Sequence, residues 1–187
     1  DYPSAIREFR QYLRVTNSDQ LAPQAYANLG ESYKQIGEQG KAIEAYEQIL
    51  SDFSNSNQAP NALTSLGLLY FEQGDYEASN KYFKRLLSIS NRFEQEAYVG
   101  MGNAQLGLSN FNIAREQFES ALRVNSNNAN AQLGLAKVAL GQSNLSEARD
   151  LLFPIADRNT TELGAESQYL LGILSKMEGN STVALEE

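Results

Sequence analysis

One stretch of the sequence constrains the fold more than any other, and it runs from Pro60 to Leu87. It reads PNALTSLGLLYFEQGDYEASNKYFKRLL. In its first half apolar residues recur at spacings of three and four, which marks one face of an α-helix, and a second amphipathic run fills its second half. Between the runs, Gly74 and Asp75 stand where one helix ends and the next begins. The stretch therefore predicts two short amphipathic helices joined by a tight turn.

The same pattern recurs along nearly the whole chain. Aligned copies begin at Pro23, Pro60, Gln95, Ala129 and Ala165, at intervals of 37, 35, 34 and 36 residues. The eighth position of each copy is small, and it reads Gly30, Gly67, Gly102, Ala136 and Gly172. The twenty-fourth position is large, and it reads Tyr46, Phe83, Phe118 and Leu152. Because glycine inside a helix costs about 1 kcal/mol relative to alanine, its recurrence predicts a close contact between paired helices.

This pattern resembles the tetratricopeptide repeat (TPR) family, whose unit of about 34 residues carries these small and aromatic positions. The resemblance implies an all-α, right-handed α-solenoid of antiparallel helix pairs with about eleven helices. We divide the chain, as one solenoid over residues 1–187, into a half repeat (1–22), four repeats (23–59, 60–94, 95–128 and 129–164) and a partial repeat (165–187). Pro154 lies inside an expected second helix, so that helix should kink or end early.

The two ends of the sequence fall inside repeats. Asp1-Tyr2 matches Asp75-Tyr76, the start of a second helix, and Glu187 lies a few residues into another second helix. Because solenoids end in polar capping repeats, we interpret the chain as a segment of a longer, bacterial protein. Apolar helix faces at such ends would let two copies associate as a homo-oligomer, through Ile6, Phe9, Leu13, Leu171 and Leu174.

Composition argues against catalysis and against several kinds of partner. The chain has no histidine and no cysteine, which removes the commonest general base and the usual ligands of structural zinc. A net charge of −8 without a basic stripe argues against nucleic acid, and no apolar run is long enough to insert into a membrane. The glycines at 100 and 102 lie inside an expected helix rather than in a phosphate loop. We expect neither a cofactor nor a metal site, and no enzyme activity.

The resemblance instead implies a binding surface. In this fold the first helices of successive repeats line a concave groove, with positions 2, 5, 6, 9, 12 and 13 pointing into it. Ten candidate residues for binding a protein or peptide follow at these positions: Asn28, Glu31, Leu68, Phe71, Val99, Asn103, Leu106, Lys137, Tyr169 and Ile173. The expected groove is polar at the start and apolar later, and unexplained apolar surface suggests a partner. Winding of the solenoid could instead bury some of these positions, Leu133 and Leu140 above all.

Two further comparisons with TPR proteins, of a peptide-binding clamp and of the loops between repeats, limit the functions that the chain could have. Some TPR domains bind acidic chaperone tails with a basic residue at position 5 and asparagine at position 9, whereas the first full repeat has Ala27 and Glu31 there. The chain therefore lacks that clamp. Its loops at 17–25 and 52–62 are similar to those of TPR proteins of the bacterial cell envelope. The same residues fit equally well the alternative that they are ordinary polar helix starts with a proline in the first turn. The expected function is a non-catalytic interaction scaffold; the alternatives are a self-association module or a non-catalytic arm of an enzyme.

Overall fold

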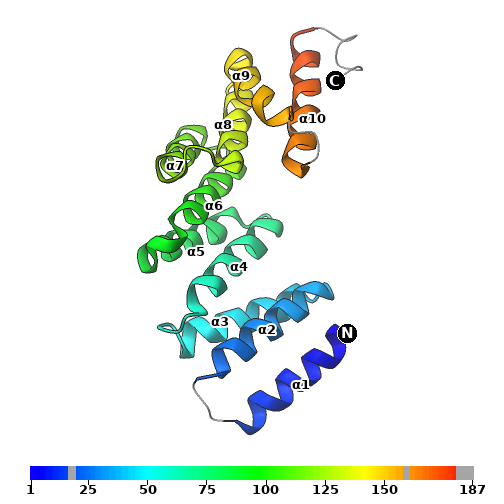
Figure 1. Ribbon diagram of the computed structural model, residues 1–187, viewed down its shortest axis with the longest axis vertical. Coiled ribbons are helices and arrows are strands. Elements are labelled where there is room, and N and C mark those ends of the chain that lie inside the picture. The colour runs from blue at the N-terminus through cyan, green and yellow to red at the C-terminus, as the bar shows by residue number, and fades with distance from the viewer. Residues whose placement is uncertain (17–19, 158–160, 180–187) are drawn as a thin grey trace. The chain divides into compact units, whose positions relative to one another are not determined.

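The computed structural model describes residues 1–16, 20–157 and 161–179, and this part of the chain is helical throughout (Figure 1). It contains ten α-helices and one 3₁₀ turn. Their bounds are α1 (Tyr2–Val15), α2 (Ala22–Gln35), α3 (Gln39–Asp52), α4 (Ala59–Glu72), α5 (Tyr76–Ile89), η1 (Asn91–Phe93), α6 (Glu94–Gly107), α7 (Phe111–Val124), α8 (Ala129–Gly141), α9 (Leu145–Ala156) and α10 (Glu162–Met177). No strand occurs among these residues, which confirms the all-α prediction. The expected eleventh helix lies outside the described residues.

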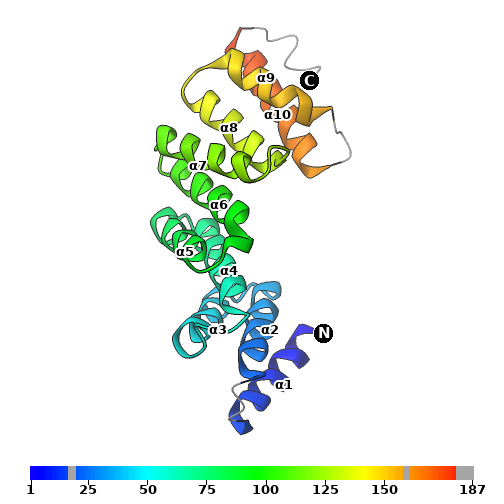
Figure 2. The ribbon, with the colours of Figure 1, turned by 60° about the vertical axis from the view of Figure 1, so that its left-hand side comes forward.

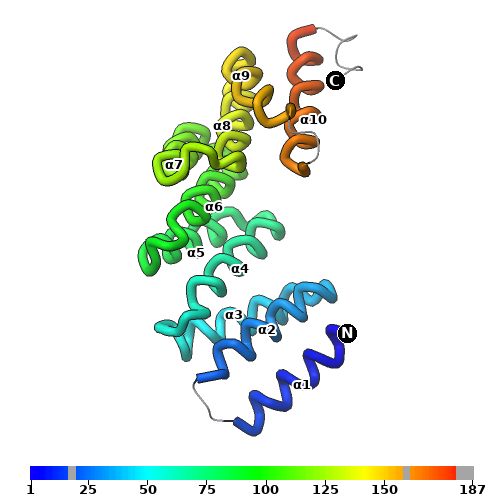
Figure 3. The backbone as a smooth tube through the Cα atoms, in the orientation of Figure 1, coloured from blue at the N-terminus to red at the C-terminus, as the bar shows by residue number. Residues whose placement is uncertain are grey.

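The helices form two compact units, residues 1–93 and 94–187. In the first unit each helix packs on the next, from α1 to α5, and α2 also contacts α4 (Figure 3). The second unit repeats this arrangement from α6 to α10, with α8 contacting both α6 and α10 (Figure 2). In each unit, therefore, first helices lie next to first helices of the following repeat, with the second helices packed between them.

In the described residues, a left-handed residue follows the first helix of each of the five repeats. Gly37, Gly74 and Gly179 have positive φ angles of 79°, 78° and 82°, as their lack of a Cβ permits. The corresponding residues of the third and fourth repeats are Ser109 and Ser143, both with φ of 59°. The left-handed conformation therefore recurs five times at this position in the described residues, twice with a side chain that disfavours it.

The close contact predicted at position eight is present, and the residue that makes it is the aromatic of position 24. A Cβ added at Gly30 would lie 2.8 Å from the Tyr46 ring, and one added at Gly67 would lie 2.7 Å from the Phe83 ring. Phe118 has such a contact on both sides, with Gly102 of α6 and Gly134 of α8. The rings are almost completely buried, so each packs directly on a helix backbone and brings neighbouring helices close together.

Most expected helix starts are correct, and the exceptions have local causes. The first four repeats begin within one residue of the predicted positions. The fifth begins at Glu162 rather than Ala165, because the Thr161 hydroxyl accepts a hydrogen bond from the Gly164 N–H at 3.0 Å and caps an earlier turn. Helix α9 ends at Ala156, two residues after Pro154, as expected for a proline that removes a helical hydrogen bond.

Candidate functional site

The candidate residues of the first unit lie on α2 and α4. On α2 they are polar and joined by short-range hydrogen bonds, with Gln24 Nε2 donating to Asn28 Oδ1 at 2.9 Å. Glu31 makes an ion pair with Lys34 at 2.7 Å and accepts a hydrogen bond from Gln35 at 2.7 Å. Partial burial opposes ionisation of Glu31, but the bonds from Lys34 and Gln35 hold its pKa below the usual range. This end of the surface therefore presents a fixed pattern of amides and one carboxylate.

Tyr46 of the second helix α3 lies beneath this surface and supports it from the core. Its ring packs on Gly30, and its hydroxyl donates to Glu31 Oε2 at 3.3 Å and accepts a hydrogen bond from the Ser65 hydroxyl of α4. Burial, together with the nearby Glu31 carboxylate, raises the pKa of Tyr46 to about 12. The recurring pair of small and aromatic residues predicted the ring contact, but only the helix geometry brings the hydroxyl between α2 and α4.

The surface becomes apolar on α4. Leu68 is 51% exposed although it is flanked by fully buried core residues of the same helix. Phe71 is half-buried, and its ring centroid lies 5.3 Å from that of Tyr76 in a tilted arrangement. Both side chains occupy predicted groove positions, and Leu68 leaves apolar surface that the described fold does not cover.

In the second unit, core packing takes up several candidate positions. Val99 and Leu106 of α6 are partly buried against the cluster around Phe118. Leu133 of α8 is only 3% exposed and belongs to a second cluster of core residues, which includes Leu152 and Leu171 and against which Leu140 packs. For Leu133, burial was the correct alternative, and it belongs to the core rather than to a binding surface.

An ion pair and an exposed aromatic side chain lie close together on α8 and α10. Lys137 Nζ of α8 lies 2.6 Å from Glu166 Oε1 of α10, so an ion pair joins two successive first helices. Tyr169, one turn after Glu166, is 69% exposed, and Ile173, one turn further, is half-buried. Asn103 of α6, the remaining candidate, is also half-buried. The second unit thus presents an aromatic ring beside a neutralised charge pair.

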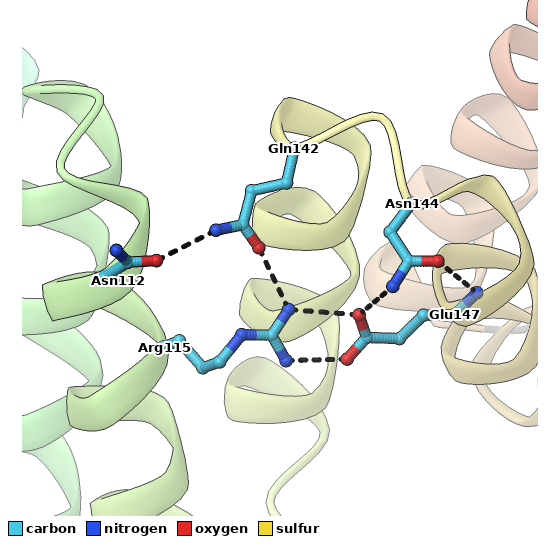
Figure 4. Close-up of polar contacts among 5 residues, drawn as sticks. All are labelled: Asn112, Arg115, Gln142, Asn144 and Glu147. Atoms are coloured by element: carbon cyan, nitrogen blue, oxygen red, sulfur yellow. Dashed lines mark hydrogen bonds and ion pairs between the residues drawn. The ribbon is translucent and has the colours of Figure 1, made fainter.

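A separate polar network lies between the second helices α7 and α9 (Figure 4). Arg115 forms a two-pronged contact with Glu147, with distances of 2.6 and 3.0 Å from its guanidinium nitrogens to the two carboxylate oxygens. Gln142 accepts from Arg115 at 3.2 Å and donates to Asn112 at 3.0 Å, while Asn144 donates to Glu147 at 2.8 Å. The Arg115 hydrogen bonds hold the pKa of Glu147 below its usual range. Sequence reasoning missed this network, whose main pair is separated by 32 residues.

None of the described helices combines the length and apolarity that crossing a lipid bilayer requires. Among the described residues there is also no cluster of three or more acidic, histidine or cysteine side chains placed to hold a metal ion.

Helix pairs repeated in series, with interlocking small and aromatic positions, define a helical-repeat protein of the α-solenoid class. Family comparison makes this specific: tetratricopeptide repeat models match residues 23–51, 60–93 and 99–162. Because these matches cover most of the chain, the chain belongs to the tetratricopeptide repeat family. Proteins of this family are protein-interaction scaffolds that bind proteins or peptides, generally without catalytic activity of their own.

Solved structures share the fold. A tetratricopeptide repeat protein from Parabacteroides merdae ATCC 43184 is 24% identical, with a TM-score of 0.86 over 100% of this chain and 70% of that one. PilF of Pseudomonas aeruginosa is 20% identical, with a TM-score of 0.69 over 99% of this chain and 87% of that one. The first TPR domain of Spaghetti (RPAP3), bound to the HSP90 peptide SRMEEVD, is 21% identical, with a TM-score of 0.60 over 67% of this chain and 96% of that one. Comparison with curated protein sequences gives no significant match.

Proposed function

We propose that each unit of the chain binds a segment of a partner protein through the exposed faces of its own first helices, at positions that line the concave groove expected of the family. The observation that carries the proposal is the exposure of Leu68 and Tyr169. Both are large side chains on first helices, at positions that the repeat pattern assigns to the groove. Full burial of one such side chain contributes about 1.5–3 kcal/mol, so the two anchors supply about 3–6 kcal/mol, and binding at micromolar concentration, which needs about 8 kcal/mol, requires further contacts with the ligand.

The polar groups beside these anchors supply specificity. In the first unit, the Glu31 carboxylate is held in place by the buried Tyr46 hydroxyl and by Lys34, and a fixed acceptor discriminates between ligands better than a mobile one. In the second unit, Lys137 and Glu166 neutralise one another. We therefore propose an apolar segment with interspersed polar groups as the ligand. An acidic tail such as the HSP90 peptide of the Spaghetti complex is disfavoured because Ala27 and Glu31 stand where the clamp for such tails has a basic residue and an asparagine.

Selection from a random peptide library tests the proposal. Peptides that bind the parent chain should lose at least about tenfold in affinity when Leu68 or Tyr169 is replaced by aspartate, since each loses an apolar anchor. The matched controls are Ile89→Asp in α5 and Phe153→Asp in α9, because these side chains are similarly exposed, at 47% and 51%, but lie on second helices. Equal losses in the controls, or full binding by Leu68→Asp and Tyr169→Asp, would show that the first-helix faces do not bind the ligand.

A further inference from the structure

The second helices of the repeats have one position whose side chain differs greatly in size from copy to copy. It is the seventh residue after the helix N-cap, and it reads Ala45 in α3, Tyr82 in α5, Gln117 in α7 and Leu151 in α9. Of these four helices, α3 alone has a small residue there. Helices α3 and α5 lie in the same compact unit, so their two versions of the position can be compared directly.

In α5 an aromatic ring fills the position. Tyr82 stacks on Tyr70 of the first helix α4, with ring centroids 5.3 Å apart and an angle of 13° between the ring planes. Its hydroxyl donates a hydrogen bond at 2.9 Å to Glu47 Oε1 of α3, the preceding second helix. Burial and this hydrogen bond raise the pKa of Tyr82 well above its usual range, so the hydroxyl remains a donor. The groove between these two second helices therefore holds a ring on top of another ring, with a charged partner for the para oxygen.

The equivalent groove between α1 and α3 is open, and it forms a pocket with a volume of about 340 Å³. Tyr33 of α2, the counterpart of Tyr70, lines the pocket together with Ala45, and both are buried. Arg10 of α1 and Lys41 of α3 are exposed at its rim, with Lys41 Nζ 5.7 Å from the centroid of the Tyr33 ring. The contacts of the filled site come from α3, α4 and α5, whose counterparts α1, α2 and α3 all bound the open pocket. The pocket is therefore open because alanine supplies no ring, whatever precedes α1.

The charge at the rim of the groove is reversed between the two copies. Arg10 is the ninth residue after the N-cap of α1, as Glu47 is in α3, so a hydrogen-bond donor replaces an acceptor. Within the part of the chain that the structure describes, Arg10 makes no ion pair. Lys41 is already paired with Glu38 at 3.1 Å, and Glu44 adds a negative charge at the rim. Arg10 is therefore the cation that is available to an anion in the pocket.

We propose that this pocket binds an aromatic ring with an anionic oxygen group in the para position, stacked on Tyr33 and held by Arg10. The ring is expected because the same groove of the next repeat holds one on the counterpart of Tyr33. The anion is expected because the para oxygen of Tyr82 reaches Glu47, and Arg10 at the equivalent position can only donate. Lys41 has to move off the ring, which its flexible stem allows. The pocket shares no residue with the ten groove candidates, so its ligand does not depend on the function proposed above.

Titration of the whole chain with 4-methylbenzoate, followed by ¹H–¹⁵N NMR at the amides of Tyr33 and Ala45, tests the proposal. Because the probe is so small, its dissociation constant should lie in the millimolar range. The control 4-methylcyclohexanecarboxylate cannot stack and 4-methylbenzylamine has the opposite charge, so each should bind at least about threefold more weakly. A free aromatic acid and a phosphorylated tyrosine side chain both carry the proposed groups. N-acetyl-phosphotyrosine amide distinguishes them at pH 5, where it carries about one negative charge on its phosphate: the tighter of the two ligands identifies the source.

Three variants of the chain complete the test. Ala45→Tyr supplies the ring from the chain itself, so it should abolish binding and shift the urea midpoint upward. Arg10→Glu gives the rim the charge that Glu47 has in the next groove, so it should reverse the preference from the acid to the amine. Its matched control is Arg14→Glu, which is exposed on the same helix but does not line the pocket, and which should leave the affinity unchanged.

Four results would overturn the proposal. Failure of the acid to shift the Tyr33 and Ala45 amides at millimolar concentration would mean that the pocket holds only solvent. Equal binding of the acid and its cyclohexane analogue would mean that no ring stacks there. Full binding by Ala45→Tyr would place the ligand elsewhere on the chain. An equal loss in Arg10→Glu and Arg14→Glu would mean that the acid responds only to the net charge of α1.

Discussion

Replacing Gly102 by alanine tests the packing on which the repeat depends. An added Cβ would lie 2.6 Å from Phe118 Cε1 and 2.8 Å from both Cδ1 and Cζ. Favourable carbon contacts lie at about 3.5–4.0 Å, so the methyl group overlaps the ring by roughly 1 Å. Gly134 holds the opposite side of the ring equally tightly, and Phe118 therefore cannot move away without displacing α8.

Two opposing effects determine the size of the change. Alanine in a helix interior is favoured over glycine by about 1 kcal/mol, while overpacking of a filled core costs about 1–3 kcal/mol. Gly40 supplies the matched control, because it lies in α3 and an added Cβ there meets nothing within 4 Å. Gly40→Ala should therefore raise the free energy of unfolding by about 0.5–1 kcal/mol. The difference between the changes in unfolding free energy that the two substitutions cause isolates the cost of the overlap, which we expect to be about 1–3 kcal/mol.

Urea unfolding followed by circular dichroism at 222 nm measures the unfolding free energy of both variants. Their midpoints can be compared if the dependence of that free energy on urea concentration is the same in each. The two substitutions lie in different compact units, so the unfolding curve is first tested for one or two transitions and each midpoint is compared with that of the parent chain. Phe118→Leu should relieve the overlap, so that Gly102→Ala is no longer destabilising in that background. If Gly102→Ala instead stabilises the chain as much as Gly40→Ala does, the ring does not hold the two helices apart and the packing argument is wrong.

Three further substitutions have expected outcomes. Ser79→Ala should raise the free energy of unfolding by about 1 kcal/mol in urea titrations, because the Ser79 hydroxyl is fully buried without a hydrogen-bond partner; a loss of stability would contradict this. Ser143→Gly should add about 0.5–1 kcal/mol by the same measurement, since a left-handed φ of 59° is strained for serine, and no change would mean that the turn is relaxed. The folded-state pKa of Glu147 is lowered by Arg115, so its contribution is present at neutral pH and lost as the pH falls through that pKa. Glu147→Gln should therefore destabilise the second unit at pH 7, with a deficit that shrinks as the pH falls through the lowered pKa of Glu147, and a deficit independent of pH would rule out the charge as its cause.

Much of the fold could be predicted from local patterns. Apolar spacings of three and four place a helix, and a glycine followed by aspartate ends one and begins another, because these effects act within one or two turns of chain. The predicted contact at Gly30 and Gly67 is also correct, since repetition of a costly glycine in four of five copies needs a common cause. The sequence did not reveal the left-handed Ser109 and Ser143, because serine carries no general preference for that conformation.

The candidate site was less accessible to sequence reasoning. The pattern assigned positions to a groove face, and on that basis Leu68 and Leu133 look equivalent, yet one is half exposed and the other lies in the core. The distinction depends on how far the next helix is rotated and how large its side chains are, which no spacing within one helix records. The ten candidate binding residues remain a prediction that the peptide experiment tests.

By itself, the sequence determined the helices, their order, their turns and the small and aromatic positions that pair them, because each is set by residues a few places apart. Only the tertiary structure decided that the Tyr46 hydroxyl reaches Glu31, that Arg115 joins Glu147 across 32 residues, and that a pocket lies beside Ala45. The reason is physical: the conformation of a helix follows from its own neighbours in sequence, whereas the partner of a side chain between helices follows from their distance and crossing angle.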